Sequence, residues 1–143
     1  MKIREAKLKD INNIYKLMSL SKELKQSTGD TYFNKKFLRK IVNDKGVILL
    51  VVEHDNKIVG VLGAAIWRKT KICYADFIFI DKKYRGKGFG IKLHQYFIKL
   101  LKKNGINYLW SIVKQEDHVL QDILKKFKYK KRYKCYYYHQ IIK

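Results

Sequence analysis

The chain has 143 residues, with 33 Lys and Arg against 12 Asp and Glu, a formal net charge of +21 and two cysteines. This length indicates a single domain spanning residues 1–143, with room for a hydrophobic core that needs no disulfide or metal, and it excludes a second catalytic domain. No run approaches the roughly 18–20 apolar residues that span a bilayer, and the N-terminus lacks the apolar segment of a secretion signal, so we expect a cytoplasmic protein without membrane association.

The cysteines and histidines do not indicate a metal site. Cys73 and Cys135 form no Cys-x-x-Cys pair, and the four histidines share no spacing typical of metal ligands. Both cysteines fall within expected strands, which favours buried and reduced thiols. We therefore expect neither a metal nor a disulfide.

The first half of the chain shows the patterns of short strands and amphipathic helices. Residues 2–6 are expected to form a strand and residues 9–19 a helix, because apolar side chains recur there at helical spacing. Residues 31–43 form a second expected helical stretch. Residues 47–53 and 58–67 have the composition of two strands, and the turn at residues 55–57 between them predicts a β-hairpin.

The second half begins with a long apolar strand pattern. After a turn at residues 68–71, residues 72–80 are expected to form a strand and residues 89–103 an amphipathic helix. Residues 106–113 predict another buried strand. Asp117 is a candidate N-cap for a helix that ends near residue 127, and residues 129–142 are expected to supply the closing strands.

A glycine-rich turn lies between the strand at 72–80 and the helix at 89–103. Its sequence, Tyr-Arg-Gly-Lys-Gly-Phe-Gly at residues 84–90, removes the Cβ atoms that would keep a polyphosphate away from backbone N–H groups, next to the positive end of a helix. The chain has no Gly-Lys-Ser/Thr as in a P-loop, and Ile91 stands where the third glycine of a dinucleotide fingerprint belongs. The pattern favours an anionic cofactor other than a hydrolysed nucleoside triphosphate or a dinucleotide.

The motif Arg-x-x-Gly-x-Gly at residues 85–90 resembles the acyl-CoA-binding motif of the GCN5-related N-acetyltransferase (GNAT) superfamily, and the order of expected elements follows that family over nearly the whole chain. The lead-in at residues 80–86 also matches, although Lys82 replaces a frequent proline. The resemblance implies a single-domain α/β fold with a mixed central sheet flanked by helices. It implies N-acetyltransferase activity with acetyl-CoA, the acetyl form of coenzyme A, as the acyl donor. The implied cofactor-binding residues are Ile78, Phe79, Ile80, Arg85, Gly86, Lys87, Gly88, Phe89 and Gly90.

The same resemblance implies how the reaction is catalysed. A carboxylate on or near the strand before the loop accepts a proton from the amine, and Asp76 is the acidic residue inside that strand. The alternative is that Asp76 faces solvent or pairs with a lysine. A backbone N–H among residues 78–80 is expected to stabilise the oxyanion. The general acid is unknown, because Leu124 stands where many relatives carry a tyrosine.

Positive charge is concentrated in the second half, where residues 82–143 hold 17 basic and 3 acidic side chains against 16 and 9 in residues 1–81. The phosphates of coenzyme A account for part of this excess. The basic run at residues 125–134 has two interpretations. It is a docking surface for RNA or an acidic protein, with Tyr129 and Tyr133 available for stacking, or it is a solvated face, which the excess of lysine over arginine favours.

We expect the acetyl group to pass directly to a primary amine of unknown identity in a ternary complex, in a monomer or a homodimer. Two alternatives stay open. The acceptor is a macromolecule, such as a protein amine or an aminoacyl-tRNA, docked on the basic C-terminal half, or the chain is a catalytically weak acetyl-CoA-binding module, as Leu124 would allow. A plain RNA-binding protein would leave the loop at residues 85–90 unexplained.

Overall fold

The computed structural model describes residues 1–21, 34–136, 138 and 140. The chain forms two compact units, Met1–Ile112 and Val113–Lys143, each treated by itself below. Within the described ranges, no helix combines the length and the hydropathy needed to cross a membrane. That residues 1–143 act as one domain stays a prediction.

The first unit is built on a five-stranded sheet in the order β1-β2-β3-β4-β5. The first four strands pair antiparallel in sequence order, whereas β5 pairs parallel to β4, so the sheet is mixed as expected. A parallel neighbour requires a crossover connection, which a helix provides between β4 and β5. The strands are β1 (Lys2–Glu5), β2 (Val47–His54), β3 (Lys57–Trp67), β4 (Ile72–Ile80) and β5 (Tyr108–Ser111).

Strands β2 and β3 form the predicted hairpin. Its turn consists of Asp55 and Asn56, whose φ angles of 49° and 58° place both residues in the left-handed region. Two such residues match the twist of the flanking strands, and Asp and Asn tolerate this conformation better than most side chains. Lys57, expected in the turn, already pairs with His54 as the first residue of β3.

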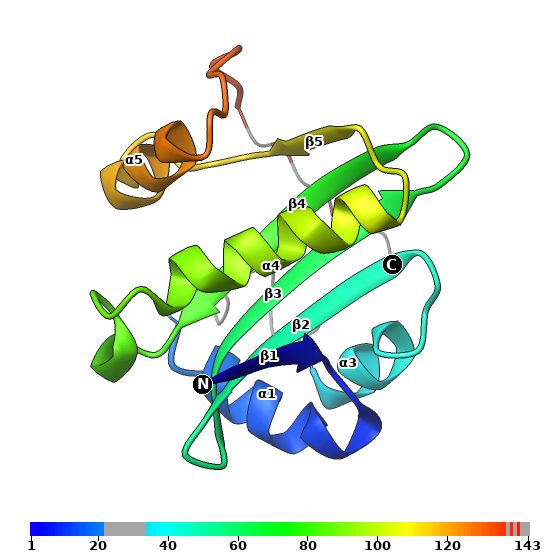
Figure 1. Ribbon diagram of the computed structural model, residues 1–143, viewed down its shortest axis with the longest axis vertical. Coiled ribbons are helices and arrows are strands. Elements are labelled where there is room, and N and C mark those ends of the chain that lie inside the picture. Colours follow the sequence, from blue (N-terminus) through cyan, green and yellow to red (C-terminus); the bar gives the residue numbers. More distant parts are fainter. Residues whose placement is uncertain (22–33, 137, 139, 141–143) are drawn as a thin grey trace. The chain divides into compact units, whose positions relative to one another are not determined.

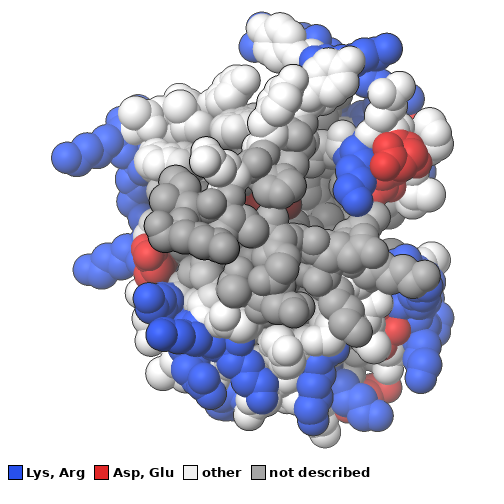
Figure 2. Space-filling model, turned by 180° about the vertical axis from the view of Figure 1, so that it is seen from behind, with Lys and Arg blue, Asp and Glu red and all other residues white. Residues whose placement is uncertain are grey.

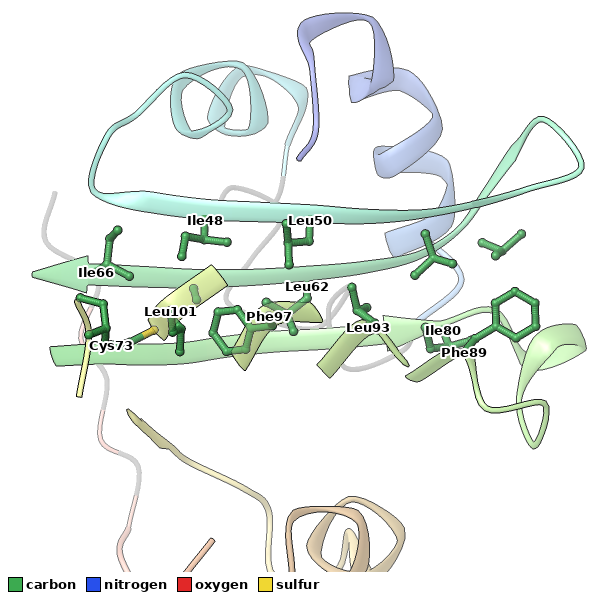
Figure 3. Packing of buried hydrophobic residues seen from close by; sticks show 14 residues of the cluster. Ile48, Leu50, Leu62, Ile66, Cys73, Ile80, Phe89, Leu93, Phe97 and Leu101 are labelled. Atoms are coloured by element: carbon green, nitrogen blue, oxygen red, sulfur yellow. The ribbon is translucent and has the colours of Figure 1, made fainter. Parts of the chain in front are cut away.

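Helices cover both faces of this sheet (Figure 1). Helix α4 (Phe89–Lys103) lies across one face, where its buried Leu93, Phe97 and Leu101 pack against apolar side chains of β2, β3 and β4 (Figure 3). Helices α1 (Ile11–Met18) and α3 (Lys35–Ile41) pack on the opposite face and enclose a second core. Because the buried residues of α1 and α4 recur at helical spacing, both helices could be predicted from the sequence.

The N-terminal helices follow the prediction with small differences. The helix expected at residues 9–19 is a 3-10 turn, η1 (Leu8–Asp10), that leads into α1. The stretch expected at 31–43 corresponds to α3, whose N-cap Asn34 accepts a hydrogen bond from the Phe37 N–H at 2.8 Å. Residues 31–33 lie outside the described ranges.

Arg4 joins the first strand to its surroundings. Its guanidinium forms ion pairs with Asp10 of η1 at 2.6 Å and with Glu53 of β2 at 2.9 Å. The hydrogen bond from Arg4 is the main reason that the pKa of Asp10 lies below its ordinary value. This contact fixes β1 against β2 and sets the start of α1.

The prediction of a buried strand at residues 106–113 is wrong in length and in burial. β5 has four residues, and its side chains Tyr108 and Trp110 are exposed. Among the described strands β5 is the last of the sheet, and α4 covers only the face that carries Leu109. A strand packed on one face alternates buried and open side chains, whatever its overall hydropathy.

The closing strands expected at residues 129–142 do not occur in the described part of this segment, since residues 129–136, 138 and 140 carry neither helix nor strand. Cys135, expected to be buried, is exposed, whereas Cys73 is buried as predicted. Strand preference reflects packing on a pleated, half-buried surface, and the strongly exposed Tyr133 and Tyr136 show that these residues lack one. The second unit does contain the predicted helix, α5 (His118–Lys126), and its N-cap Asp117 accepts a hydrogen bond from the Leu120 N–H at 3.0 Å.

Candidate active site

The glycine-rich turn adopts a conformation that side chains with a Cβ disfavour. After the 3-10 turn η2 (Lys82–Tyr84), Gly86 and Gly88 have φ angles of 73° and 78°, and Gly88 is the N-cap of α4. A Cβ atom added at either glycine would meet no atom within 4 Å. The space above these two residues is therefore open, and it is the space that an approaching ligand would use.

The backbone N–H groups of this turn find no acceptor within the part of the chain that the structure describes. Among the described residues, no carbonyl or side-chain oxygen accepts a hydrogen bond from the N–H groups of residues 86–91. Positive φ at Gly86 and Gly88, with Lys87 between them outside that region, is the alternation that turns successive N–H groups toward one side. Together with the first turn of α4, these groups form a concave surface that suits an anion such as a phosphate.

Arg85 holds the turn against β4. Its Nε donates a hydrogen bond to the carbonyl of Ile80 at 2.9 Å, and its guanidinium lies 5.3 Å from the centre of the Phe79 ring. On the other side of the turn, the rings of Tyr84 and Phe89 are in edge contact at 5.8 Å, and Phe89 is buried. The arginine of the motif thus shapes the loop through the strand, and it adds positive charge beside the free N–H groups.

Strand β4 has an open edge next to this turn. Its pairing with β5 covers only Ile72–Ala75, and the hydroxyl of Ser111, the last residue of β5, donates to the carbonyl of Ala75 at 2.9 Å. From Asp76 to Ile80, the described residues provide no partner strand on that side. The two strands therefore diverge at Ser111.

The direction of each backbone N–H group along this open edge follows from the pairing with β3, because successive residues of a strand point these groups to opposite sides. The N–H of Asp81 donates to the carbonyl of Val59 in β3 at 2.9 Å, so the N–H groups of Ile80 and Ile78 point away from β3. The contact of Arg85 with the Ile80 carbonyl agrees, because both polar groups of one residue lie on the same side of a strand. Phe79 directs its N–H toward β3 instead.

Asp76 lies at an irregularity of the sheet. Gly63 pairs with Phe77 and Ala64 with Ala75, so Asp76 is the extra residue of a β-bulge in β4. Bulges redirect side chains and occur often beside active sites. Asp76 is exposed, yet neighbouring atoms displace enough water to raise the pKa of its carboxyl, and the polar side chain of Tyr74 partly offsets this rise.

The structure brings most of the predicted site residues to one end of β4. The open edge at residues 78–80 leads through η2 into the turn at 85–90 and the first turn of α4, and the bulge at Asp76 lies earlier in the same strand. Leu124 lies in α5, in the separate second unit. Sequence reasoning missed the bulge and the role of Ser111; the excess of one residue in β4 over its pairing with β3 cannot be read from a single chain.

Two further titratable groups of the first unit are kept uncharged by burial. Burial lowers the pKa of His94 on α4 to about 4, so this imidazole is neutral near pH 7. Burial raises the pKa of the Cys73 thiol to about 12, which leaves it protonated. No group of three or more His, Cys, Asp or Glu side chains within the described ranges is arranged to hold a metal ion.

Comparison with known proteins decides the family. The model of the acetyltransferase (GNAT) family matches residues 11–129, which is most of the chain. The chain belongs to the acetyltransferase (GNAT) family. This GNAT chain is 25% identical over 125 residues to a protein of Bacillus subtilis (strain 168) with the provisional name ribosomal protein bS18-alanine N-acetyltransferase, covering 87% of this chain and 78% of that one.

Solved structures agree with the GNAT fold. An aminoglycoside acetyltransferase from an uncultured soil metagenomic sample is similar with a TM-score of 0.80 at 18% identity, covering 99% of this chain and 96% of that one. The PaiA N-acetyltransferase of Thermoplasma acidophilum, solved with coenzyme A, is similar with a TM-score of 0.78 at 18% identity, covering 88% and 87%. The predicted α/β fold and the predicted class of N-acetyltransferase are confirmed, whereas the roles of individual GNAT site residues stay predictions.

Proposed function

We propose that this GNAT chain transfers the acetyl group of acetyl-CoA to a primary amine by direct attack in a ternary complex. The observation that carries the proposal is the set of unpaired N–H groups at residues 86–91, beside a strand edge that is open from Asp76 onward. A pyrophosphate fits the first feature and an amide-bearing chain fits the second. The PaiA N-acetyltransferase, which was solved with coenzyme A bound, supports the same cofactor.

Each predicted cofactor residue has a distinct task in this proposal. Gly86, Gly88 and Gly90 keep Cβ atoms off the path of the phosphates, and the N–H groups of residues 86–91 bind them. Arg85 and Lys87 add positive charge, and Phe89 anchors the turn in the core. Along the open edge, Ile78 and Ile80 direct their backbone N–H groups outward, so they are the candidate donors to the carbonyl oxygen of the acetyl group.

Asp76 is the proposed base. A primary amine with a reference pKa near 10.4 is mostly protonated at neutral pH and must lose a proton before it can attack. The amine nitrogen then bonds to the acetyl carbon and the C–S bond breaks, with its electron pair going to sulfur. The ammonium group gives up two protons, both of which reach solvent, the first through Asp76. The thiolate takes one proton from solvent, so one proton is released overall. A raised carboxyl pKa suits a proton acceptor because it brings the acid and base forms closer to the working pH.

The position that the family pattern assigns to the acid for the departing thiolate carries no acid in this chain. Leu124 occupies the position of the tyrosine in the family pattern, and leucine carries no exchangeable proton. We propose that the thiolate takes its proton from solvent, at some cost in rate. Binding of acetyl-CoA without transfer to any amine would favour the alternative of a weakly catalytic binding module.

A second candidate is an acceptor amine on a macromolecule, and the charge distribution favours it. In the described part of Met1–Ile112, no lysine forms an ion pair, while Asp10 and Glu53 are held by Arg4. Lys and Arg side chains gather around the margins of the face seen in Figure 2, with few acidic side chains among them. The Bacillus subtilis relative bears the name of an enzyme acting on an alanine of a ribosomal protein, which agrees with this candidate.

We further propose a cytoplasmic location, as a monomer or homodimer, with residues 1–143 as a single domain. Both cysteines are free thiols, as a reducing compartment would leave them. No membrane partner is proposed.

The test of the proposed function is calorimetric titration of acetyl-CoA into the wild type and Gly88→Val. A β-branched residue at φ 78° is strained and places methyl groups in the open space above the turn, so binding should weaken at least tenfold. Gly105→Val is the matched control, because Gly105 has φ 70° and equally open surroundings but lies at the far end of α4. Both variants should lose similar stability, about 1–2 kcal/mol. Equal affinity in all three proteins would refute the proposed cofactor site.

A further inference from the structure

The side chain of His54 contacts both ends of the glycine-rich turn. It belongs to the last residue of β2 and is 32% exposed. The centre of its ring lies 5.8 Å from that of Tyr84, which precedes the turn, and 5.2 Å from that of Phe89, which begins α4. Tyr84 and Phe89 also touch each other at 5.8 Å, so the three rings form a closed triangle of edge contacts. Residues 85–88 are therefore flanked on both sides by rings that pack against the β2–β3 hairpin.

One atom of the His54 ring has no partner. Within the described ranges, Nδ1 of His54 is the buried side-chain nitrogen or oxygen that lacks a hydrogen bond. The other nitrogen, Nε2, lies 3.4 Å from a carboxylate oxygen of Asp55, which favours the tautomer with its hydrogen on Nε2 and leaves Nδ1 as an acceptor only. Buried polar atoms without partners are rare and costly. A phenylalanine would fill the same space without this cost, so packing alone does not account for a histidine here.

The unpartnered nitrogen makes the ring cluster sensitive to the charge of the imidazole. When a histidine gains a proton, both of its ring nitrogens become donors. A hydrogen on Nδ1 would be buried beside two aromatic rings, with no acceptor for it among the described residues. The charged imidazole must then leave the cluster or draw water into it. Either change moves the two ends of the turn.

The charged groups around His54 oppose one another. Asp55 and Lys57 lie beside it in the hairpin, and Lys87 of the turn lies 5.6 Å from the ring of Tyr84. From α4 the imidazole meets an apolar ring. The carboxylate favours the charged imidazole, but it is 80% exposed, so solvent weakens this attraction, and the two lysines act against it.

We propose that His54, as the neutral imidazole, is a positioning residue that holds the glycine-rich turn in the conformation that binds acetyl-CoA. The inference rests on the proposed function, because that function assigns the turn to the phosphates of the cofactor. His54 acts through Tyr84 and Phe89 and needs no contact with the cofactor itself. Acidification releases the two rings, so the affinity for acetyl-CoA falls with pH.

Calorimetric titration of acetyl-CoA at pH 8.0 and pH 5.5 tests this role. His54→Phe keeps a ring in the cluster but cannot be protonated, so its affinity should match that of the wild type at pH 8.0. At pH 5.5 it should bind about fivefold more tightly than the wild type, because histidine ordinarily gains its proton between these values. A phosphate of acetyl-CoA also changes charge in this range, and comparing proteins at one pH cancels that effect. His118→Phe is the matched control, since it removes an exposed imidazole from the second unit and should follow the wild type at both pH values.

A second pair of variants separates positioning from stability. His54→Ala removes the ring, and acetyl-CoA should bind about tenfold more weakly at pH 8.0, because both ends of the turn lose a contact. Tyr15→Ala removes a ring that is 37% exposed from α1, on the sheet face opposite α4. It should lower the melting temperature without changing the affinity. Thermal unfolding at both pH values verifies that each protein is folded, and His54→Phe decides the question alone where His54→Ala does not fold.

The outcomes separate this inference from the function beneath it. Wild-type affinity in His54→Ala, or a loss no larger than that of Tyr15→Ala, would overturn the inference, because the turn would then not depend on the ring. A ratio of affinities between His54→Phe and the wild type that is the same at both pH values would overturn it as well, since the proton would then act elsewhere. Failure of the wild type to bind acetyl-CoA at pH 8.0 would instead refute the proposed function.

Discussion

At the scale of single residues, the ionised carboxylate of Asp76 lowers the stability of the fold but is needed for its proposed role as a base. Loss of surrounding water raises the pKa of its carboxyl, and the polar side chain of Tyr74 only partly reverses this rise. A carboxyl whose pKa is higher in the folded protein than in the unfolded chain binds its proton more tightly when folded. The ionised carboxylate therefore destabilises the folded protein at neutral pH. This destabilisation disappears as the pH falls through the pKa of the folded state, because the carboxyl is then protonated.

Asp76→Asn should accordingly raise the melting temperature at pH 7.5 while abolishing most acetyl transfer. The expected rise is about 1–2 °C, which is small because solvent screens an exposed charge. The difference from the wild type should shrink at pH 4.5, where more of the wild-type carboxyl is protonated. Thermal unfolding at both pH values measures it.

Glu116→Gln is the control for this comparison, since it removes one negative charge from an exposed position outside β4. Removing any carboxylate increases the self-repulsion of a basic chain, and the control corrects for that effect. A melting temperature of Asp76→Asn equal to or below that of Glu116→Gln at pH 7.5 would show that Asp76 carries no desolvation cost.

Among the secondary-structure elements, β3 depends on Gly63 to accommodate the bulged strand beside it. A Cβ atom added to Gly63 would lie 2.3 Å from the ring of Phe77, its register partner in β4. The ring packs across the strand where that side chain would be, next to the bulge residue Asp76. The backbone of Gly63 is extended, so the constraint is one of space rather than of φ.

Gly63→Ala should therefore destabilise the protein by about 1–3 kcal/mol, the usual cost of overpacking a core. Chemical denaturation measures the free energy of unfolding. Phe77→Leu should restore part of the loss in the double variant, which a double-mutant cycle reports as a coupling between the two positions. Gly90→Ala is the control in the same assay, because its added Cβ would lie no closer than 3.7 Å to a neighbour. Independent effects at positions 63 and 77 would contradict a steric cause.

Prediction from the sequence worked where one residue pattern determines one element. The limits of β4 and α4 were predicted as observed, because an apolar run ends at a glycine turn and the helix repeats its apolar face to Lys103. β5 and the segment after Lys128 were predicted poorly, since strand formation depends on a partner that the local sequence does not specify. The glycine-rich turn of the candidate site could also be predicted, because its conformation depends on its own glycines. The bulge at Asp76 and the contact between Tyr74 and Trp110 arise from register, which one sequence does not reveal.

For the whole molecule, the dominant physical property is uncompensated positive charge. Residues 82–115, which include the cofactor turn, α4 and β5, contain no Asp or Glu. Elsewhere in the first unit, Asp44 and Asp81 accept hydrogen bonds from backbone N–H groups at 2.7 and 3.0 Å, so they serve local turns. The field around the first unit is thus positive, and it should attract acceptors that carry negative charge away from the reacting amine.

Two peptides of equal length test this consequence. Both begin with a free alanine amine, and one carries four Asp residues near its C-terminus where the other carries four Gln. At 20 mM salt we expect kcat/KM to be about fivefold higher for the acidic peptide, because long-range attraction speeds encounter. At 500 mM salt the screening length is only a few ångströms, so the two values should converge. The Gln peptide is the matched control for the amine chemistry. If kcat/KM of the two peptides changes with salt in the same proportion, the positive field does not select the acceptor. The substrates to pursue would then be small amines without negative charge.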